Sequence, residues 1–96
     1  MPGNVNPQQQ IASVTSTAAA VTFTAGNVGA IAIENSGAND CWFTINGLPA
    51  AASDGANRTR LKAGESFADS NLECNSIGFI CATTTTVQVY SKEVGG

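Results

Sequence analysis

Short runs of alternating apolar and polar residues, separated by turn-forming residues, dominate the sequence. In residues 28–34, for example, Ile31 and Ile33 fall on one side of an extended chain. Alternation with a period of two is typical of strands that bury one face. No ten-residue stretch has a convincing helical period, although the alanines of 13–21 leave a short helix open as an alternative there. The pattern therefore predicts an all-β protein.

About seven to eight short antiparallel strands are expected, at 11–17, 21–25, 28–34, 41–46, 58–62, 65–68, 76–82 and 85–91. The turn residues of 35–40 give the strongest hairpin signal and predict that the strands on either side pair directly. Residues 48–57 are expected to form a mobile or partner-facing loop, and 69–75 to leave the sheet. Regularly spaced short strands indicate a single-domain β-sandwich with a jelly-roll-like arrangement.

The first ten residues differ in composition from the rest. They hold two prolines, two asparagines and three glutamines, and Val5 is their one apolar residue after Met1. Such a segment buries too little apolar surface to offset its ordering entropy. We therefore expect residues 1–10 to be a flexible arm that can order against a neighbouring subunit, and residues 11–96 to be the β-sandwich domain.

The charged residues argue against several classes of function. The chain has no histidine, four Lys+Arg and seven Asp+Glu, with a net charge of -3. Histidine is the commonest acid–base catalyst, and most carboxylates here fall in turns, where they bond local backbone amides. A negative net charge disfavours nucleic-acid binding, and no apolar run approaches the ~20 residues that span a bilayer. We expect a soluble, non-enzymatic protein without cofactor or metal that binds neither nucleic acid nor a membrane.

The cysteines and the start of the chain bear on where the protein is made. Cys41, Cys74 and Cys81 are odd in number and lack the spacing of a zinc site. They predict free, partly buried thiols, with a bridge between Cys74 and Cys81 left open. The start has no basic region followed by an apolar run, so no secretion signal is predicted and synthesis in the cytoplasm is expected.

Two features point to contacts with other molecules. Trp42 alternates with apolar residues of the strand expected at 41–46, so its ring is predicted to point outward. Either a neighbouring loop covers the ring, or the ring anchors an interface, where tryptophan is enriched. Arg58, Arg60 and Lys62 occupy every second position. They form a solvated strand face, or the arginines pair with carboxylates of a partner.

Four segments carry a resemblance to a known group of proteins. They are AIAIENSG at 30–37, DCWFTING at 40–47, RLKAGESF at 60–67 and IGFICA at 77–82. Together they resemble small β-sandwich virion proteins of tailed bacteriophages, in particular capsid decoration (cement) proteins. The resemblance covers roughly residues 28–90. It implies a structural virion protein that binds the major capsid protein on the outer head surface, at joints between capsid subunits, and stabilises the shell. It implies no catalytic residue.

A homo-oligomer is expected, with a trimer favoured. The candidate contact residues are Asn4, Asn6, Gln8, Gln9 and Gln10 of the arm, with Trp42, Arg58 and Arg60 of the domain. Proteins that resemble this pattern also occur in phage tails, necks and fibres, so a tail, neck or fibre subunit is the alternative. A carbohydrate-binding β-module is less favoured, because it would need an exposed Trp42 or Tyr90 on which a sugar can stack.

Overall fold

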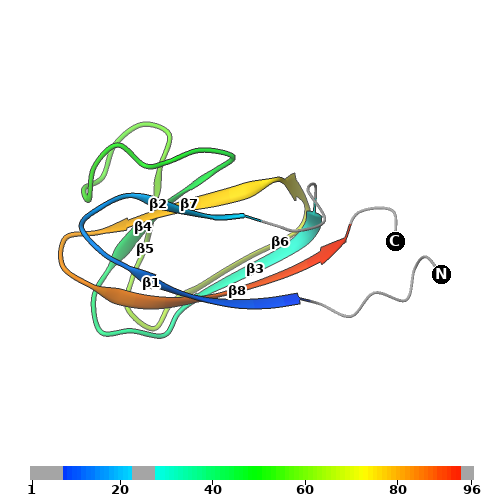
Figure 1. Ribbon diagram of the computed structural model, residues 1–96, viewed down its shortest axis with the longest axis horizontal. Coiled ribbons are helices and arrows are strands. Elements are labelled where there is room, and N and C mark those ends of the chain that lie inside the picture. Colours follow the sequence, from blue (N-terminus) through cyan, green and yellow to red (C-terminus); the bar gives the residue numbers. More distant parts are fainter. Residues whose placement is uncertain (1–7, 23–27, 94–96) are drawn as a thin grey trace.

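A computed structural model describes the backbone of residues 8–22 and 28–93 and the side chains of 10–22, 31–69 and 74–91 (Figure 1). Its eight strands are β1 (Gln8–Val14), β2 (Ala19–Thr22), β3 (Val28–Asn35), β4 (Cys41–Ile45), β5 (Thr59–Leu61), β6 (Ser66–Cys74), β7 (Ser76–Cys81) and β8 (Thr85–Glu93). The all-β prediction is confirmed, and the region at 13–21 contains the end of β1 and the start of β2 instead of a helix. No helix long and apolar enough to cross a membrane occurs among the residues described.

The strands pair in a nested order. β1 pairs with β8, β2 with β7, β3 with β6 and β4 with β5, all antiparallel. This is the pairing of one long hairpin that has been wrapped around itself, with its bend between β4 and β5. Two further pairs, β3 with β8 and β4 with β7, complete two four-stranded sheets.

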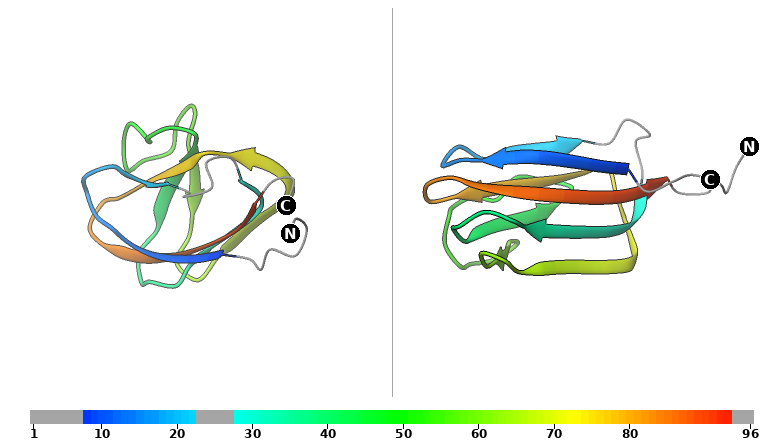
Figure 2. Two further views of the ribbon diagram at one scale, coloured as in Figure 1. Left: turned by 45° about the vertical axis from the view of Figure 1, so that its right-hand side comes forward. Right: turned by 90° about the horizontal axis from the view of Figure 1, so that it is seen from below.

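The sheets have the orders β1-β8-β3-β6, here sheet A, and β2-β7-β4-β5, here sheet B. The right-hand view of Figure 2 shows the four strands of sheet A side by side. Eight antiparallel strands wrapped into two packed sheets form a jelly roll, so the expected fold class is confirmed.

The core lies between the two sheets and follows the alternation of the strands. Ile31 and Ile33 of sheet A are each 1% exposed, as their spacing predicted. From sheet B, the Phe43 ring packs with its centroid 5.1 Å from that of Phe67 and 6.4 Å from that of Phe79. The buried core also includes Val14, Val21, Cys41, Leu61, Cys74, Ile77, Cys81, Val87 and Val89. Inward apolar side chains from both sheets therefore hold the sandwich together.

The predicted hairpin at 35–40 is wrong. β3 belongs to sheet A and β4 to sheet B, so the turn carries the chain from one sheet to the other. The backbone amides of Ser36 and Gly37 both donate to the carbonyl oxygen of Thr86, at 2.9 and 3.1 Å. Turn residues mark where the chain reverses, but the partner of the next strand is decided by long-range pairing.

A single buried amide joins three connections at this end of the sandwich. Asn35 is fully buried, and its Nδ2 donates to the carbonyl oxygens of Asn39, at 2.8 Å, and Leu61, at 3.0 Å. Its Oδ1 accepts from Thr85 Oγ1 at 2.8 Å and from the Gly37 amide at 3.1 Å. One side chain thus links the turn after β3 to the end of β5 and the start of β8.

Two strands extend three or more residues beyond their predicted bounds. β1 begins at Gln8, three residues before the expected start of the domain, because Gln8–Gln10 pair with Val89–Ser91 of β8. The rest of the expected arm lies outside the described residues. β6 continues to Cys74, through most of the segment expected to leave the sheet. The irregularity there is a register shift against β3, between Gly29 and Ile31.

Candidate functional site

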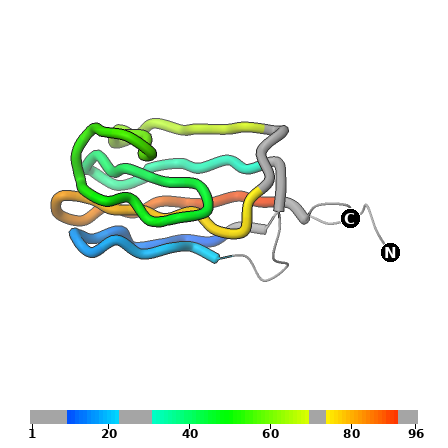
Figure 3. The backbone as a smooth tube through the Cα atoms, turned by 90° about the horizontal axis from the view of Figure 1, so that it is seen from above, coloured from blue at the N-terminus to red at the C-terminus, as the bar shows by residue number. Residues whose placement is uncertain are grey.

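The loop between β4 and β5, residues 46–58, folds back over the outer face of sheet B (Figures 1 and 3). Asn46 and Asn57 adopt positive φ angles of 56° and 63°, which asparagine tolerates better than most residues. Asn46 Oδ1 accepts from the Asn75 amide at 2.7 Å, and Thr44 Oγ1 donates to the Asn57 carbonyl at 2.8 Å. One end of the loop is therefore tied to the connection between β6 and β7, and the other end to β4.

The loop also touches the backbone of β7. A Cβ atom on Gly78 would lie 2.1 Å from the carbonyl oxygen of Gly47 and 2.8 Å from the Cα atom of Leu48. Real Cβ atoms essentially never approach that closely. The start of the loop can thus lie against β7 only because position 78 has no side chain.

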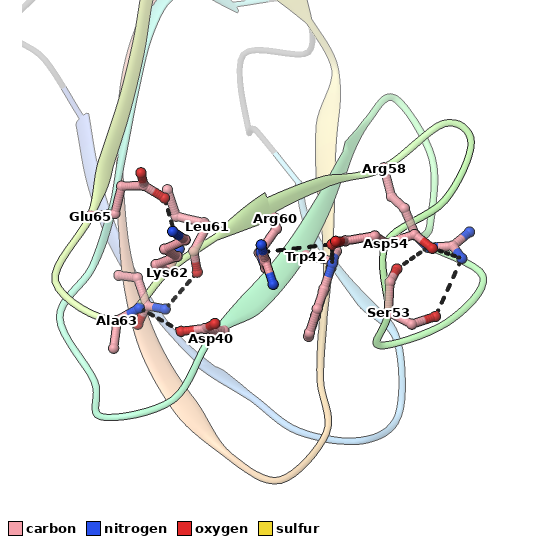
Figure 4. A network of polar contacts seen from close by, with 11 residues as sticks. Asp40, Trp42, Ser53, Asp54, Arg58, Arg60, Leu61, Lys62, Ala63 and Glu65 are labelled. Carbon is pink, nitrogen blue, oxygen red and sulfur yellow. Dashed lines mark hydrogen bonds and ion pairs between the residues drawn. The ribbon is translucent and has the colours of Figure 1, made fainter.

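Trp42 lies on the outer face of sheet B, as predicted, and the loop covers it. The side chain is 9% exposed, and its indole Nε1 donates to Oδ1 of Asp54 in the loop at 2.9 Å (Figure 4). Ile80, its neighbour across the strands, is 8% exposed. Of the two interpretations of Trp42, the covering loop is therefore the one that the structure shows. A second small apolar layer lies under this loop.

Arg58 directs its guanidinium into the same loop. Nε donates to the Ser53 carbonyl at 2.6 Å, Nη1 to the Ala56 carbonyl at 3.3 Å and Nη2 to the Asp54 carbonyl at 3.4 Å. A Cβ atom on Gly55 would lie 2.3 Å from Nη2, so glycine there makes room for the guanidinium. The donors of Arg58 are thus occupied in holding the loop, which leaves fewer of them for the carboxylates of a partner.

Arg60 stands beside Trp42 on the neighbouring strand. Its Nε lies 3.7 Å from Oδ1 of Asp54, and the two side chains are 43% and 67% exposed. Exposed ion pairs of this kind contribute about 1 kcal/mol or less. Asp54 therefore links Trp42 and Arg60 in one polar network (Figure 4). Asp54 lies in a loop without periodicity, so no spacing in the sequence connects it to Trp42.

The arm residues lie apart from this network. Gln10 is in β1, where its Nε2 donates to the Thr22 carbonyl at 3.1 Å and bridges sheet A to the edge of sheet B. Gln8 and Gln9 are in β1 too, and their side chains lie outside the described ones. Asn4 and Asn6 lie outside the described residues altogether. The structure thus brings together Trp42, Arg58 and Arg60, and it places Gln8–Gln10 on a different strand and sheet.

The outer face of sheet A, here the A face, is a second candidate surface. Its described side chains are Ile11, Ser13, Ala32, Glu34, Ser66, Ala68, Thr86, Gln88 and Tyr90. Most are small, and among them Glu34 alone is charged. Ile11 is 69% exposed at the edge of the face, and the Tyr90 hydroxyl donates to Gln88 Oε1 at 2.8 Å. The described part of this face offers contact area with few charges to desolvate.

The three cysteines are free, as predicted, and they are fully buried where partial burial was expected. Cys41 and Cys81 face each other on β4 and β7. Burial, with smaller contributions from the nearby Cys81 and Asp40, raises the pKa of the Cys41 thiol to about 12. Burial also raises the pKa of Cys74. The folded protein thus favours the neutral thiols of Cys41 and Cys74, which are the poorly reactive form.

The raised pKa of the Cys41 thiol predicts a loss of stability at high pH. Above pH 9.0, the ordinary pKa of Cys41, the unfolded chain releases the thiol proton while the folded chain keeps it. The free energy of unfolding should therefore fall as pH rises from about 9 towards 12. Urea unfolding at pH 8 and pH 10 measures the fall, which should be smaller in Cys41→Ala. Equal falls in the two proteins would contradict this role of Cys41.

Comparisons with known proteins give two structural similarities. The chain is similar to a de novo designed double-stranded β-helix, with 19% identity and a TM-score of 0.46, over 88% of this chain and 96% of that one. It is also similar to a structure of Bacillus endospore appendages, a family of disulfide-linked pili, with 11% identity and a TM-score of 0.49, over 94% of this chain and 91% of that one. No family model matches the chain, and no curated protein matches it. At these identities and scores, neither similarity identifies a function.

Proposed function

We propose that the protein is a capsid decoration protein of a tailed bacteriophage. It would bind the major capsid protein on the outer head surface, at joints between capsid subunits, and stabilise the shell. The resemblance in sequence over residues 28–90 supports this proposal, and the segments that carry it lie within one jelly-roll sandwich. Because a fold alone does not define a function, the proposal also needs a surface suited to the task.

The A face is the observation that carries the proposal. Burying a charge in a contact is costly unless a partner neutralises it, whereas small neutral side chains are desolvated cheaply. Among the described side chains of this face, Glu34 is the one that would need such a partner. At ~25 cal/mol per Å² of apolar surface, a modest patch contributes several kcal/mol before the costs of association. A shell offers many equivalent sites, so linked copies would add avidity.

Two alternative functions are a tail, neck or fibre subunit and a carbohydrate-binding module, and the structure supports the first better than the second. A tail, neck or fibre subunit would use the same neutral face, and the location of the protein in the virion separates the two. A carbohydrate-binding module is less well supported, because the Trp42 ring is covered and its N–H is occupied by Asp54. Tyr90 is only partly exposed and its hydroxyl bonds Gln88. Neither ring is an open platform for a sugar.

Binding to undecorated heads tests the proposal. Ala68 is exposed on the A face, so Ala68→Glu places a charge there without disturbing the core. We expect this variant to bind purified heads at least about tenfold more weakly than the wild type, a difference of about 1.4 kcal/mol. Co-sedimentation of the labelled protein with heads measures the affinity.

The matched control is Ala56→Glu, which adds the same charge to an exposed position in the loop over sheet B. It should bind within about twofold of the wild type if the A face makes the contact. Equal binding by both variants would show that the A face does not make the contact with the head. A wild-type protein that does not bind heads at all would refute the decoration function.

A further inference from the structure

The four edge strands of the sandwich differ in how well they are protected against pairing with another chain. Natural proteins protect edge strands by making them short, by placing charges on them or by inserting bulges. β5 has three residues and carries Arg60, and β2 has four residues. β6 carries Asp69 and a register shift. β1 has none of these features: it is seven residues long, uncharged and free of proline, and it pairs with β8 without a shift.

The hydrogen bonds of β8 show which groups of β1 point towards the open edge. The Thr86 carbonyl accepts from the amides that follow β3, so Thr86 directs its backbone groups away from β1. Ser13 lies opposite Thr86, and the two form a non-hydrogen-bonded pair. Because such pairs alternate with hydrogen-bonded ones, Gln9 and Ile11 share the orientation of Ser13. These three residues therefore present their N–H and C=O groups at the edge of sheet A that β1 forms. The strand β1 is drawn in blue beside β8 in the right-hand view of Figure 2.

Ile11 adds an apolar contact to this edge. It is the middle residue of β1, and its side chain is 69% exposed on the A face. Removing a large apolar side chain from water stabilises an association. An added strand would bring its own side chain against Ile11, while the backbone groups on either side form a ladder.

We propose that the occupant of this edge is β1 of a second copy, paired antiparallel about a two-fold axis at Ile11. Ile11 then faces Ile11 of the second copy, and Gln9 faces Ser13 at either side, so each of these pairs exchanges two N–H···O=C bonds. The two A sheets become one continuous eight-stranded sheet. The match is self-complementary, as a two-fold interface requires. No charge lies on β1, so like-charge repulsion does not oppose the pairing.

This inference does not depend on the function proposed above. It replaces the expected trimer with a two-fold dimer, and it assigns the contact to named backbone groups. The capsid-binding test uses Ala68, on the opposite edge strand of sheet A. A failed dimer test and a failed head-binding test can therefore be told apart.

Sedimentation equilibrium and amide hydrogen exchange of the full chain test the dimer. The mass should rise with concentration from 9.7 kDa to twice that value and no further. The amides of Gln9, Ile11 and Ser13 should become protected over the same concentration range. Those of Ala12 and Val14 bond β8 and should be protected throughout, which provides an internal control. A wild type that stays monomeric to millimolar concentration, or grows into larger assemblies, would overturn the proposal.

Two pairs of variants connect the dimer to β1. Ile11→Lys places two like charges at the centre of the interface, and Ala68→Lys adds the same charge at the far edge of the sheet. Ser13→Pro removes an N–H that points to the edge and spares the bonds to β8, and Ser13→Ala keeps that N–H. Ile11→Lys and Ser13→Pro should each raise the dimer Kd at least about tenfold. Their controls, Ala68→Lys and Ser13→Ala, should each leave the Kd within about twofold of the wild-type value. A dimer that survives both Ile11→Lys and Ser13→Pro would contradict pairing through β1. So would a dimer in which the amides of Gln9, Ile11 and Ser13 stay unprotected.

Discussion

Replacing Asn35 by alanine is expected to lower the free energy of unfolding by about 3 kcal/mol. The substitution removes bonds to the Asn39 and Leu61 carbonyls and to the Thr85 hydroxyl, at 2.8, 3.0 and 2.8 Å. Asn35 is 0% exposed, so water replaces those bonds poorly. A buried polar group left without a partner costs about 1–3 kcal/mol, and several are left here. Urea unfolding of the wild type and the variant measures the loss.

Asn39→Ala is the matched control. Asn39 has the same side chain and lies in the turn that follows Asn35, but it is exposed and its Nδ2 makes one bond, to the Thr84 carbonyl at 2.8 Å. Losing this one bond should lower the free energy of unfolding by about 1 kcal/mol or less. If the two alanine variants lost equal stability, Asn35 would not be the group that joins the three connections.

Gly78→Ala is the second substitution with a large expected effect. The new methyl group would lie 2.1 Å from the Gly47 carbonyl oxygen, and the obstacle is backbone that cannot rotate away. The start of the 46–58 loop must therefore lift from β7. We expect the free energy of unfolding to fall by about 2–3 kcal/mol, at the upper end of the usual cost of overpacking. We also expect a red shift in the fluorescence of Trp42, because the loop that covers the ring is displaced.

Gly47→Ala is the control for this substitution, because it adds the same methyl group to the other side of the contact. There the methyl would lie 3.4 Å from Thr44 Cγ2, a distance close to ordinary van der Waals contact. Its stability should stay within about 0.5 kcal/mol of the wild type, and the Trp42 emission should not move. Equal emission spectra and stabilities for the two variants would show that the loop does not depend on Gly78.

The sequence predicted the fold class because alternation is a local property. Ile31, Ile33 and Phe43 could be assigned to the core from their spacing alone, and the structure buries all three. Sheet membership is a long-range property, and this is why the hairpin predicted at 35–40 was wrong. Asn35 looked like an ordinary turn residue, because its role depends on β5 and β8 arriving at the same place.

The candidate site could be predicted only in part. The outward direction of Trp42 followed from alternation, whereas its cover by Asp54 depends on how a loop without periodicity folds back. Composition alone placed Gln8–Gln10 in the arm, although β8 supplies them with a strand partner. The open edge of β1 became visible only when the four edge strands could be compared.

Cryo-electron microscopy of the parent virion is the most direct test of the decoration function. The proposal predicts density of this jelly-roll shape on the outer surface of the head, at the joints between capsid subunits, with the A face towards the shell. Density for the protein only along the tail, neck or fibres, or its absence from the virion, would contradict it.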